Sequence, residues 1–144
     1  MKQLPSIVIT GASGFIGSYL IDYIKEDFKI FAIARRSRKE ANIPYHQNLH
    51  WLQCDISNWV TLNEAADYIN KQGGTDFVVH LAAFYDFTYK DNTAYKNVNV
   101  DGTKNMLDFS ALVKTKRFIF ASSIAACEFP SYGNVITEKT SPDA

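Results

Sequence analysis

Short continuous apolar runs alternate along the chain with longer stretches in which apolar residues recur about every three to four positions. A continuous run is typical of a strand buried on both faces of a sheet, and the longer period is typical of an amphipathic helix. The runs predict five strands, at Ser6–Thr10, Lys29–Ala34, Asn48–Gln53, Asp76–His80 and Arg117–Ala121. The alternation of the two patterns predicts an α/β fold.

Three stretches with helical spacing lie between these strands. The first begins at Gly14, the second covers Thr61–Lys71 and ends before Gly73-Gly74, and the third and longest covers Tyr95–Val113. The expected buried positions are Ile16, Leu20, Tyr23 and Ile24 in the first, Leu62, Ala65, Ala66 and Ile69 in the second, and Val98, Met106, Phe109 and Val113 in the third.

Buried strands joined through helices run parallel, because each crossover returns the chain to the same end of the sheet. The right-handed crossover rule then predicts a doubly wound parallel sheet with strand order 3-2-1-4-5, in one domain over residues 1–144. The connection from Ala34 to Leu49 is long enough to hide a helical turn. Ser122 to Ala144 shows little period and is expected to be mostly loop.

A glycine-rich segment, Thr10-Gly11-Ala12-Ser13-Gly14-Phe15-Ile16-Gly17, joins the first strand to the first helix. Gly11 suits the tight turn, Gly14 has no Cβ to block a diphosphate, and Gly17 lets the helix pack closely. Free amides at the helix N-terminus, around Gly14, Phe15 and Ile16, are candidate phosphate donors. The predicted cofactor-binding residues here are Gly11, Ser13, Gly14, Phe15, Ile16 and Gly17. The alternative is a glycine-rich loop with no ligand.

The residues after the second strand bear on which dinucleotide would bind. Sites that prefer NAD place a carboxylate at the end of this strand to accept from the ribose 2′-OH. Ala34 stands at that position, Arg35 and Arg36 follow, and the next carboxylate is Glu40. A guanidinium pairs with a 2′-phosphate through two parallel hydrogen bonds. We therefore predict NADP(H) in preference to NAD, with Arg35 as first candidate and Arg36 as second; the alternative is a solvated basic loop.

Composition narrows the function classes. Lys and Arg total 15 and Asp and Glu total 15, so the charge balance does not favour nucleic acid or an anionic membrane surface. The longest apolar run, Ile30–Ala34, is too short to cross a bilayer. Cys54 and Cys127 have no metal-ligand spacing, and free thiols are typical of a reducing compartment. We expect a cytoplasmic protein with no metal site, no nucleic-acid partner and no membrane partner.

Four further segments, together with the glycine turn, resemble the extended short-chain dehydrogenase/reductase family, and within it the NAD-dependent epimerase/dehydratase group. They are Asp55-Ile56, His80-Leu81-Ala82-Ala83, Asn97-Val98-Asn99-Val100-Asp101-Gly102-Thr103 and Phe118-Ile119-Phe120-Ala121-Ser122-Ser123, in the family's order. The resemblance implies a Rossmann-type domain in which Asp55 and Ile56 contact the adenine. It places Leu81, Ala82 and Ala83 beside the riboses. It also implies a catalytic hydroxyl on Ser123 and a structural role for Asn99.

Two features depart from the family pattern. Ile124-Ala125-Ala126-Cys127-Glu128 follows Ser123, where the family often has Val-Tyr-Gly, and none of the eight tyrosines has Lys four positions later. Family members use such a Tyr and Lys for proton transfer. The resemblance therefore implies a cofactor-binding part, truncated before this pair and inactive by itself.

These observations together predict the NADP(H)-binding portion of an oxidoreductase or epimerase/dehydratase that acts by hydride transfer on a small carbonyl or hydroxyl substrate. The alternative is a non-catalytic dinucleotide-sensing or regulatory module of the same fold. The outer edge of the fifth strand is a candidate site for a homo-oligomer. His80 is expected to be structural. The aromatic stretch Phe84–Tyr89 either floors a substrate pocket or packs against another part of the protein.

Overall fold

A computed structural model describes residues 4–88, 92–127 and 130–142 of the chain. Its strands are β1 Ser6–Thr10, β2 Lys29–Ala34, β3 Leu49–Gln53, β4 Phe77–His80 and β5 Arg117–Phe120. Its helices are α1 Phe15–Ile24, α2 Trp59–Lys71, a π-helix η1 Tyr95–Gly102 that runs directly into α3 Thr103–Leu112, and a 3-10 turn η2 Ile124–Ala126. All five predicted strands are present, within one residue of the expected bounds.

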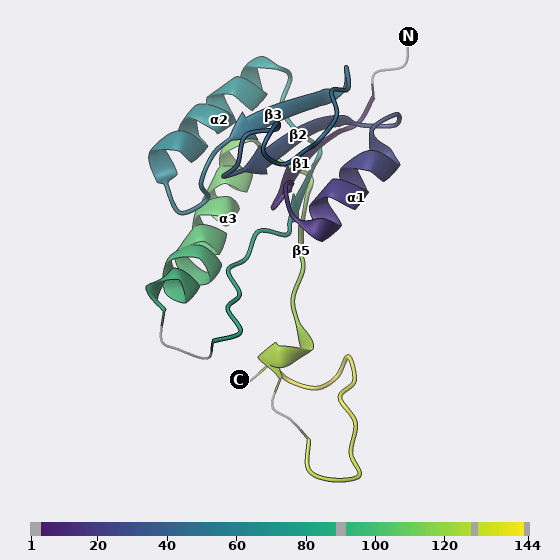
Figure 1. Ribbon diagram of the computed structural model, residues 1–144, viewed down its shortest axis with the longest axis vertical. Helices are drawn as coiled ribbons and strands as arrows, with labels where there is room; N and C mark the ends of the chain where they lie inside the picture. Colours follow the sequence, from purple (N-terminus) through teal and green to yellow (C-terminus); the bar gives the residue numbers. More distant parts are fainter. Residues whose placement is uncertain (1–3, 89–91, 128–129, 143–144) are drawn as a thin grey trace.

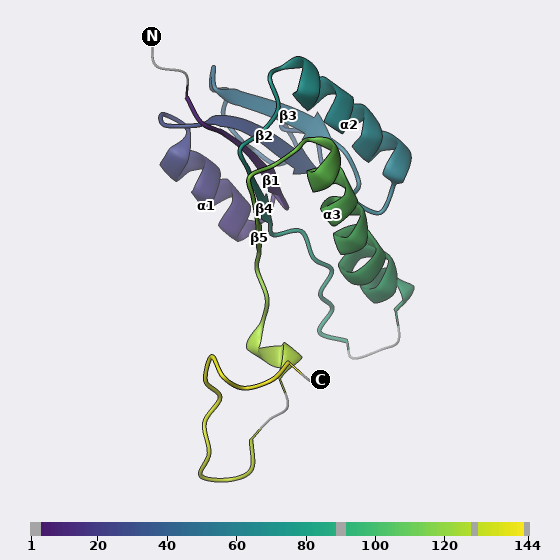
Figure 2. The same ribbon diagram turned by 180° about the vertical axis from the view of Figure 1, so that it is seen from behind.

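The five strands form one parallel sheet in the order β3-β2-β1-β4-β5, which confirms the predicted topology. The sheet lies between two layers of helices, with α1 on one face and α2 and α3 on the other (Figures 1 and 2). In the central strand, Ile9 pairs with Ala32 of β2 on one side and with Val79 of β4 on the other. The chain changes direction across the sheet between β1 and β4, and this is where ligands bind in open α/β sheets.

The helices α2 and α3 bury the faces that the sequence predicts. Their apolar positions pack against the sheet in one core layer, which contains Leu62, Ala65, Ala66, Ile69, Met106, Phe109 and Val113. Val98 of η1 packs against the edge of this layer. These faces follow directly from the helical period, because nothing else competes for the apolar side of either helix.

The buried face of α1 agrees with the prediction in part, since Leu20 and Ile24 are partly buried and pack against the core. Its buried residues are Gly17 and Ile21, whereas Ile16 is 63% exposed and Tyr23 is 87% exposed. The cause is Gly17, since a Cβ on this residue would collide with the carbonyl oxygen of Gly11. The helix is therefore rotated so that Gly17 faces the glycine turn, and the face that contains Ile21 follows it toward the sheet.

Three connecting regions also refine the predictions. The expected single helix over Tyr95–Val113 consists of η1 and α3. The connection from β2 to β3 contains one isolated helical turn, in which the Ala41 amide donates to the Ser37 carbonyl at 3.0 Å. After β5, the described residues form η2 and then loop, and this segment extends away from the sheet (Figure 1). None of the helices in the described ranges has the length and apolar character needed to cross a membrane.

Candidate functional site

A cleft of about 630 Å³ lies at the carboxyl edge of the sheet, where β1, β2, β3 and β4 end. Most of the residues predicted to bind cofactor line it: Gly11, Ser13, Gly14, Arg35, Arg36, Asp55, Ile56, Leu81, Ala82 and Ala83. Phe15, Ile16 and Gly17 form the first turn of α1 behind the glycine turn. Ile33, Ala34, Glu40, Gln53, Cys54 and Val98 also line the cleft and were not predicted. Several of these residues lie at or just after the ends of strands. Their position could have been predicted, because the carboxyl ends of parallel strands share one edge of the sheet.

The turn after β1 brings two backbone segments into close contact. Gly11 has φ of +67°, a conformation that favours glycine. A Cβ at this position would lie 2.8 Å from the Ala82 amide nitrogen and 2.9 Å from the Leu81 carbonyl carbon. Gly11 therefore allows both the turn and the approach of the chain that follows β4. The glycine turn and the segment after β4 become two adjoining walls of the cleft.

The start of α1 offers backbone amides at the cleft. No side chain caps this end of the helix. The structure changes the predicted donor set, because the Gly14 amide already donates to the Gly11 carbonyl at 2.9 Å. In the described part of the chain, no backbone carbonyl accepts from the amides of Ser13, Phe15 or Ile16. These three amides, together with the positive end of the helix dipole, suit an anion.

The loop after β2 is fixed to its neighbours through its backbone and one guanidinium. Nη2 of Arg36 donates to the Ser13 carbonyl at 2.6 Å. The carbonyls of Arg35 and Arg36 accept from Gln53 Nε2 and Trp51 Nε1, each at 3.0 Å. The loop therefore places Arg35 and Arg36 at the cleft, and the side chain of Arg36 joins the loop to the glycine turn.

Glu40 is the carboxylate nearest to these arginines in sequence, and it folds back onto its own loop. Its Oε2 accepts from the Ser37 amide at 2.8 Å and from the Ser37 hydroxyl at 2.7 Å. These hydrogen bonds lower the pKa of Glu40, and the charge of Arg36 adds to the effect. The Glu40 carboxylate is thus ionised near neutral pH and occupied by Ser37.

The wall after β3 contains Asp55 and Ile56. Oδ1 of Asp55 accepts from the Ser57 amide at 2.9 Å and from the Ser57 hydroxyl at 2.7 Å. The Ile56 side chain is buried, and its carbonyl accepts from Asn105 Nδ2 at 2.9 Å. These contacts hold the backbone of the wall in place, and both residues line the cleft. Cys54 precedes them, and burial raises the pKa of its thiol, so it is a packed thiol.

A buried polar group lies directly beneath the cleft. His80 is 1% exposed, and its Nδ1 lies 2.7 Å from Thr10 Oγ1 while its Nε2 lies 3.0 Å from Thr103 Oγ1. Thr10 Oγ1 already accepts from the amides of Leu81 and Ala82, so its hydroxyl donates to Nδ1, and Nε2–H donates to Thr103. Burial lowers the pKa of His80 to about 4. His80 is therefore a structural histidine, as predicted.

The loop after β4 is held by Asn99 of η1. The side-chain amide accepts from the Phe84 amide at 2.7 Å and donates to the Phe84 carbonyl at 2.9 Å. This bidentate contact anchors the loop after β4 to η1. Tyr85 and Phe87 further along are 63% and 76% exposed, with their ring centroids 4.7 Å apart.

Ser123, the predicted catalytic residue, follows β5 at the same edge of the sheet. The Ala121 amide donates to the His80 carbonyl at 3.2 Å, and the Ser123 carbonyl accepts from the Ala126 amide at 3.0 Å. Ser123 is exposed and is not among the residues that line the cleft. Its catalytic role stays a prediction.

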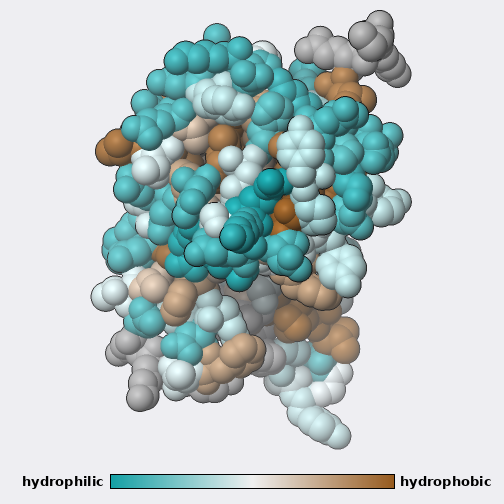
Figure 3. Space-filling model, turned by 45° about the horizontal axis from the view of Figure 1, so that its top comes forward, coloured by the Kyte–Doolittle hydropathy of each residue, from teal (hydrophilic) through white to brown (hydrophobic). Residues whose placement is uncertain are grey.

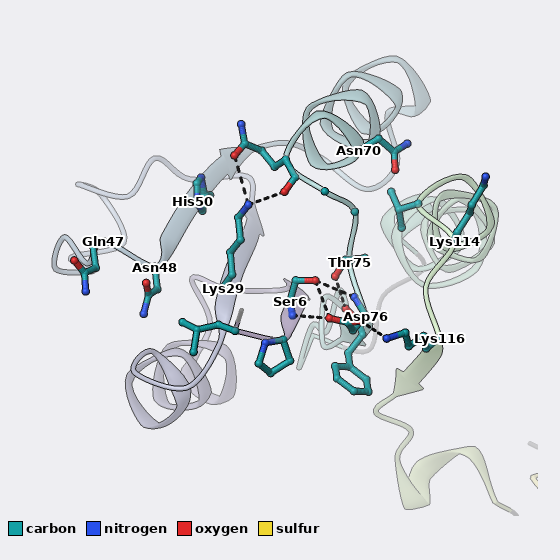
Figure 4. Close-up of a pocket in the computed structure, with 17 residues that line it drawn as sticks. Ser6, Lys29, Gln47, Asn48, His50, Asn70, Thr75, Asp76, Lys114 and Lys116 are labelled. Carbon is teal, nitrogen blue, oxygen red and sulfur yellow. Dashed lines mark hydrogen bonds and ion pairs between the residues drawn. The ribbon is translucent and has the colours of Figure 1, made fainter. Parts of the chain in front are cut away.

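A second, larger hollow of about 1100 Å³ lies at the amino edge of the sheet. Some of its polar groups pair with one another: Lys29 Nζ donates to the Gln72 carbonyl at 2.8 Å, and Asp76 pairs with Lys116 at 2.6 Å (Figure 4). Hydrophilic side chains cover most of this edge of the molecule (Figure 3). The helices end here, so their dipoles present negative charge. This hollow is therefore a poor match for a phosphate group.

The cleft therefore combines a glycine turn, an uncapped helix N-terminus and an arginine pair at the switch point of a parallel sheet. The sequence profile of the NAD-dependent epimerase/dehydratase family matches residues 7–144. The chain belongs to this family. Its match covers nearly the whole chain, including all five strands of the sheet.

Family relatives include enzymes of more than one reaction type. The dihydroflavonol 4-reductase of Arabidopsis thaliana is 31% identical over 134 residues, which cover 85% of this chain and 33% of the reductase. The dTDP-D-glucose 4,6-dehydratase of Dictyostelium discoideum is 28% identical over 130 residues, which cover 83% of this chain and 29% of the dehydratase. The chain thus spans about a third of the length of these curated relatives.

Solved structures show the same fold with a bound dinucleotide. The Bordetella bronchiseptica enzyme WbmG in complex with NAD is 25% identical, with a TM-score of 0.70 and coverage of 82% of this chain and 37% of that chain. The yeast methylglyoxal/isovaleraldehyde reductase complexed with NADPH is also 25% identical, with a TM-score of 0.72 and coverage of 85% and 38%. The fold therefore accommodates both dinucleotides.

Proposed function

We propose that this chain is the cofactor-binding part of an NADP(H)-dependent oxidoreductase or epimerase/dehydratase that acts on a small carbonyl or hydroxyl substrate. The observation that carries the proposal is the uncapped start of α1 behind a glycine turn, with Arg35 and Arg36 at the same cleft. The family match supports the dinucleotide, and Arg35 supports NADP(H) in particular.

The residues of the cleft fit such a cofactor. The amides of Ser13, Phe15 and Ile16 would donate to the diphosphate. A Cβ on Gly14 would lie 3.1 Å from the Gly11 carbonyl oxygen, so glycine at this position keeps the turn tight. Oδ2 of Asp55 would accept from the adenine amino group, since Oδ1 is occupied by Ser57. The nicotinamide would supply hydride exchange with the substrate carbon. The protein's part is to bind and orient it at the carboxyl edge.

Arg35 is the residue proposed to select the 2′-phosphate. Ala34 offers no acceptor for a ribose hydroxyl, and the Glu40 carboxylate is engaged by Ser37. The Arg35 carbonyl accepts from Gln53 Nε2, so its backbone is fixed at the cleft that Arg35 lines. A charge-assisted bidentate pair with phosphate therefore favours NADPH over NADH.

Calorimetric titration of the purified chain with NADPH and with NADH tests this proposal. Tighter binding of NADPH is expected. Arg35→Ala should weaken NADPH by about tenfold or more, because about 1.5–3 kcal/mol is typical of hydrogen bonds to charged groups, and should leave NADH unchanged. Arg38→Ala is the matched control, since Arg38 lies over the Tyr45 ring and is outside the cleft lining. Tighter binding of NADH by the unaltered chain would contradict the assignment.

The same proposal assigns Ser123 a hydrogen bond to the reacting oxygen of the substrate. Proton transfer in the family uses a Tyr and a Lys four positions later, a pair that is absent from these 144 residues. We therefore expect this chain alone to bind dinucleotide without turnover. Steady hydride transfer from NADPH to any carbonyl substrate, followed as loss of NADPH absorbance, would show that other residues carry the chemistry.

A non-catalytic dinucleotide sensor of the same fold is the second candidate. Sequencing the coding region past the codon for Ala144 separates the two. A Tyr-x-x-x-Lys within roughly 20 residues supports the enzyme. A longer coding region without this pair supports the sensor.

Self-association through β5 is a further part of the proposal. In the described part of the chain, β5 pairs with β4 and with no strand on its other side. Ile119 and Phe120 on this strand are 46% and 53% exposed. An open edge with apolar side chains is a site for pairing with another copy. Sedimentation of the chain across a concentration range is expected to show dimer, and Ile119→Lys is expected to reduce it.

A further inference from the structure

One peptide unit of the glycine turn is held at both of its ends. The Gly14 amide donates to the Gly11 carbonyl at 2.9 Å, and the Ser13 carbonyl of the same peptide accepts from Arg36 at 2.6 Å. In a trans peptide the N–H and C=O groups point in opposite directions. Two partners on opposite sides therefore fix the orientation of this peptide, which lies between the amides of Ser13 and Phe15.

The donor of the second contact is itself fixed. The Arg36 carbonyl accepts from Trp51 Nε1 at 3.0 Å, so its backbone is tied to β3. The turn that follows begins with a reciprocal cap, in which Glu40 accepts from the Ser37 amide at 2.8 Å and the Glu40 amide donates to the Ser37 hydroxyl at 3.3 Å. Arg36 thus reaches the glycine turn from a backbone that is anchored on both sides.

We propose that Arg36 is a positioning residue for the cofactor diphosphate and that the neighbouring Arg35 alone selects the 2′-phosphate. The inference rests on the proposed function. The guanidinium offsets the partial negative charge of the Ser13 carbonyl, which would otherwise stand beside an anionic ligand. It also holds the Ser13–Gly14 peptide in the orientation that leaves the Phe15 and Ile16 amides for phosphate.

The two arginines are adjacent in sequence, yet the roles predict different ligand profiles. Loss of a diphosphate-positioning residue weakens every ligand that carries the diphosphate, whether or not it has a 2′-phosphate. Loss of a 2′-phosphate contact weakens NADPH only. ADP carries the diphosphate without nicotinamide or 2′-phosphate, so it isolates the first effect.

The experiment compares Arg36→Ala and Arg35→Ala by calorimetric titration with ADP, NADH and NADPH. Arg36→Ala is expected to weaken all three by a similar factor of about tenfold, the size of one charge-assisted hydrogen bond. Arg35→Ala is expected to weaken NADPH alone. Arg36→Lys restores a charge and a single donor, so it should recover part of the affinity for all three. Circular dichroism and thermal unfolding check that each variant keeps the fold, and Arg38→Ala is the matched control.

Three outcomes overturn the inference. If Arg36→Ala weakens only NADPH, Arg36 contacts the 2′-phosphate directly. If it weakens none of the ligands, the contact with Ser13 has no part in binding. If it weakens all three but Arg36→Lys recovers nothing and the melting temperature falls, the role is structural. Failure of the proposed function gives another pattern, because the unaltered chain then binds none of the three.

Discussion

The two hollows of this molecule lie at opposite edges of one sheet and differ in how their polar groups are used. The amino-edge hollow is the larger, at about 1100 Å³ against about 630 Å³. Two of its lysines and its carboxylate are engaged with neighbouring groups, in the pairs of Lys29 with Gln72 and of Asp76 with Lys116. The glycine turn at the carboxyl-edge cleft instead leads into α1, whose start has no side-chain cap.

Helix direction, more than volume, explains this difference. In a parallel sheet with crossover helices, each helix starts at the carboxyl edge of the strands and ends at the amino edge. Free amides and positive dipole ends therefore collect at one edge, and carbonyls collect at the other. The comparison teaches that an anion site in this fold is found from the polarity of the helices, even where a larger hollow exists elsewhere.

Matched Gly→Ala substitutions at the two edges should give the largest difference in unfolding free energy and in NADPH binding. Gly11 and Gly73 both have positive φ, +67° and +101°, but a Cβ on Gly11 meets the backbone of Leu81 and Ala82, whereas a Cβ on Gly73 meets no atom within 4 Å. Gly73→Ala should cost about 1–2 kcal/mol of unfolding free energy from backbone strain alone and leave NADPH binding intact. Gly11→Ala adds overlap, for a total cost of about 3 kcal/mol or more, and abolishes binding.

Urea unfolding and NADPH titration measure both effects. Gly11→Ala and Gly73→Ala carry the same added methyl group, so the difference between them reports the local contacts. Equal losses of stability, with NADPH binding retained in both variants, would show that the close approach of the two walls is not required.

Lowering the pH should reduce the folding stability that His80 and Asp76 contribute at the two edges, in a different pH range for each. The pKa of His80, beneath the cleft, is about 4 in the folded chain because of burial, against about 6.5 in the unfolded chain. The unfolded chain therefore binds more protons between these values, and stability falls as the pH drops through this window. From pH 7.5 to pH 5, His80 should account for a loss of about 2 kcal/mol. Unfolding at a series of pH values measures the loss.

Asp76 at the amino edge behaves differently. Hydrogen bonds from Lys116 first, and then from Ser6, lower its pKa below the ordinary value of 3.8. Its contribution to stability is present above that value and is lost only in more acid solution.

His50 is a second histidine with a lowered pKa, caused by burial and then by the charge of Lys29. NMR titration of the His80 ring distinguishes its pKa from that of His50. A pKa near 6.5 for His80 would contradict its burial between Thr10 and Thr103.

Lys116→Ala should give the smallest effect. The Lys116 side chain is 75% exposed, and exposed ion pairs typically contribute about 0–1 kcal/mol. Thermal unfolding should therefore change little, NADPH affinity should not change, and the pKa of Asp76 should rise toward its ordinary value. A large loss of NADPH affinity in this variant would mean that the amino-edge hollow takes part in binding.

Periodicity and motif spacing predicted much of this molecule. The strand order, the buried faces of α2 and α3 and the walls of the cleft follow from patterns that are local in sequence. The face of α1 was predicted only in part. Leu20 and Ile24 pack against the core as expected, but Ile16 and Tyr23 are exposed because a backbone contact between Gly17 and Gly11 set the rotation. A glycine has no side chain to contribute to an apolar stripe, so the pattern gave it no weight.

By itself, the sequence determined which residues could form a phosphate-binding turn and that basic residues would follow β2. Only the tertiary structure decided how the candidates are used: the Gly14 amide is consumed within the turn, and Arg36 reaches back to Ser13. His80 meets Thr10 and Thr103 from positions 70 and 23 residues away. The physical reason is that a side-chain hydrogen bond depends on distances and angles between segments far apart in the chain, which local patterns do not encode.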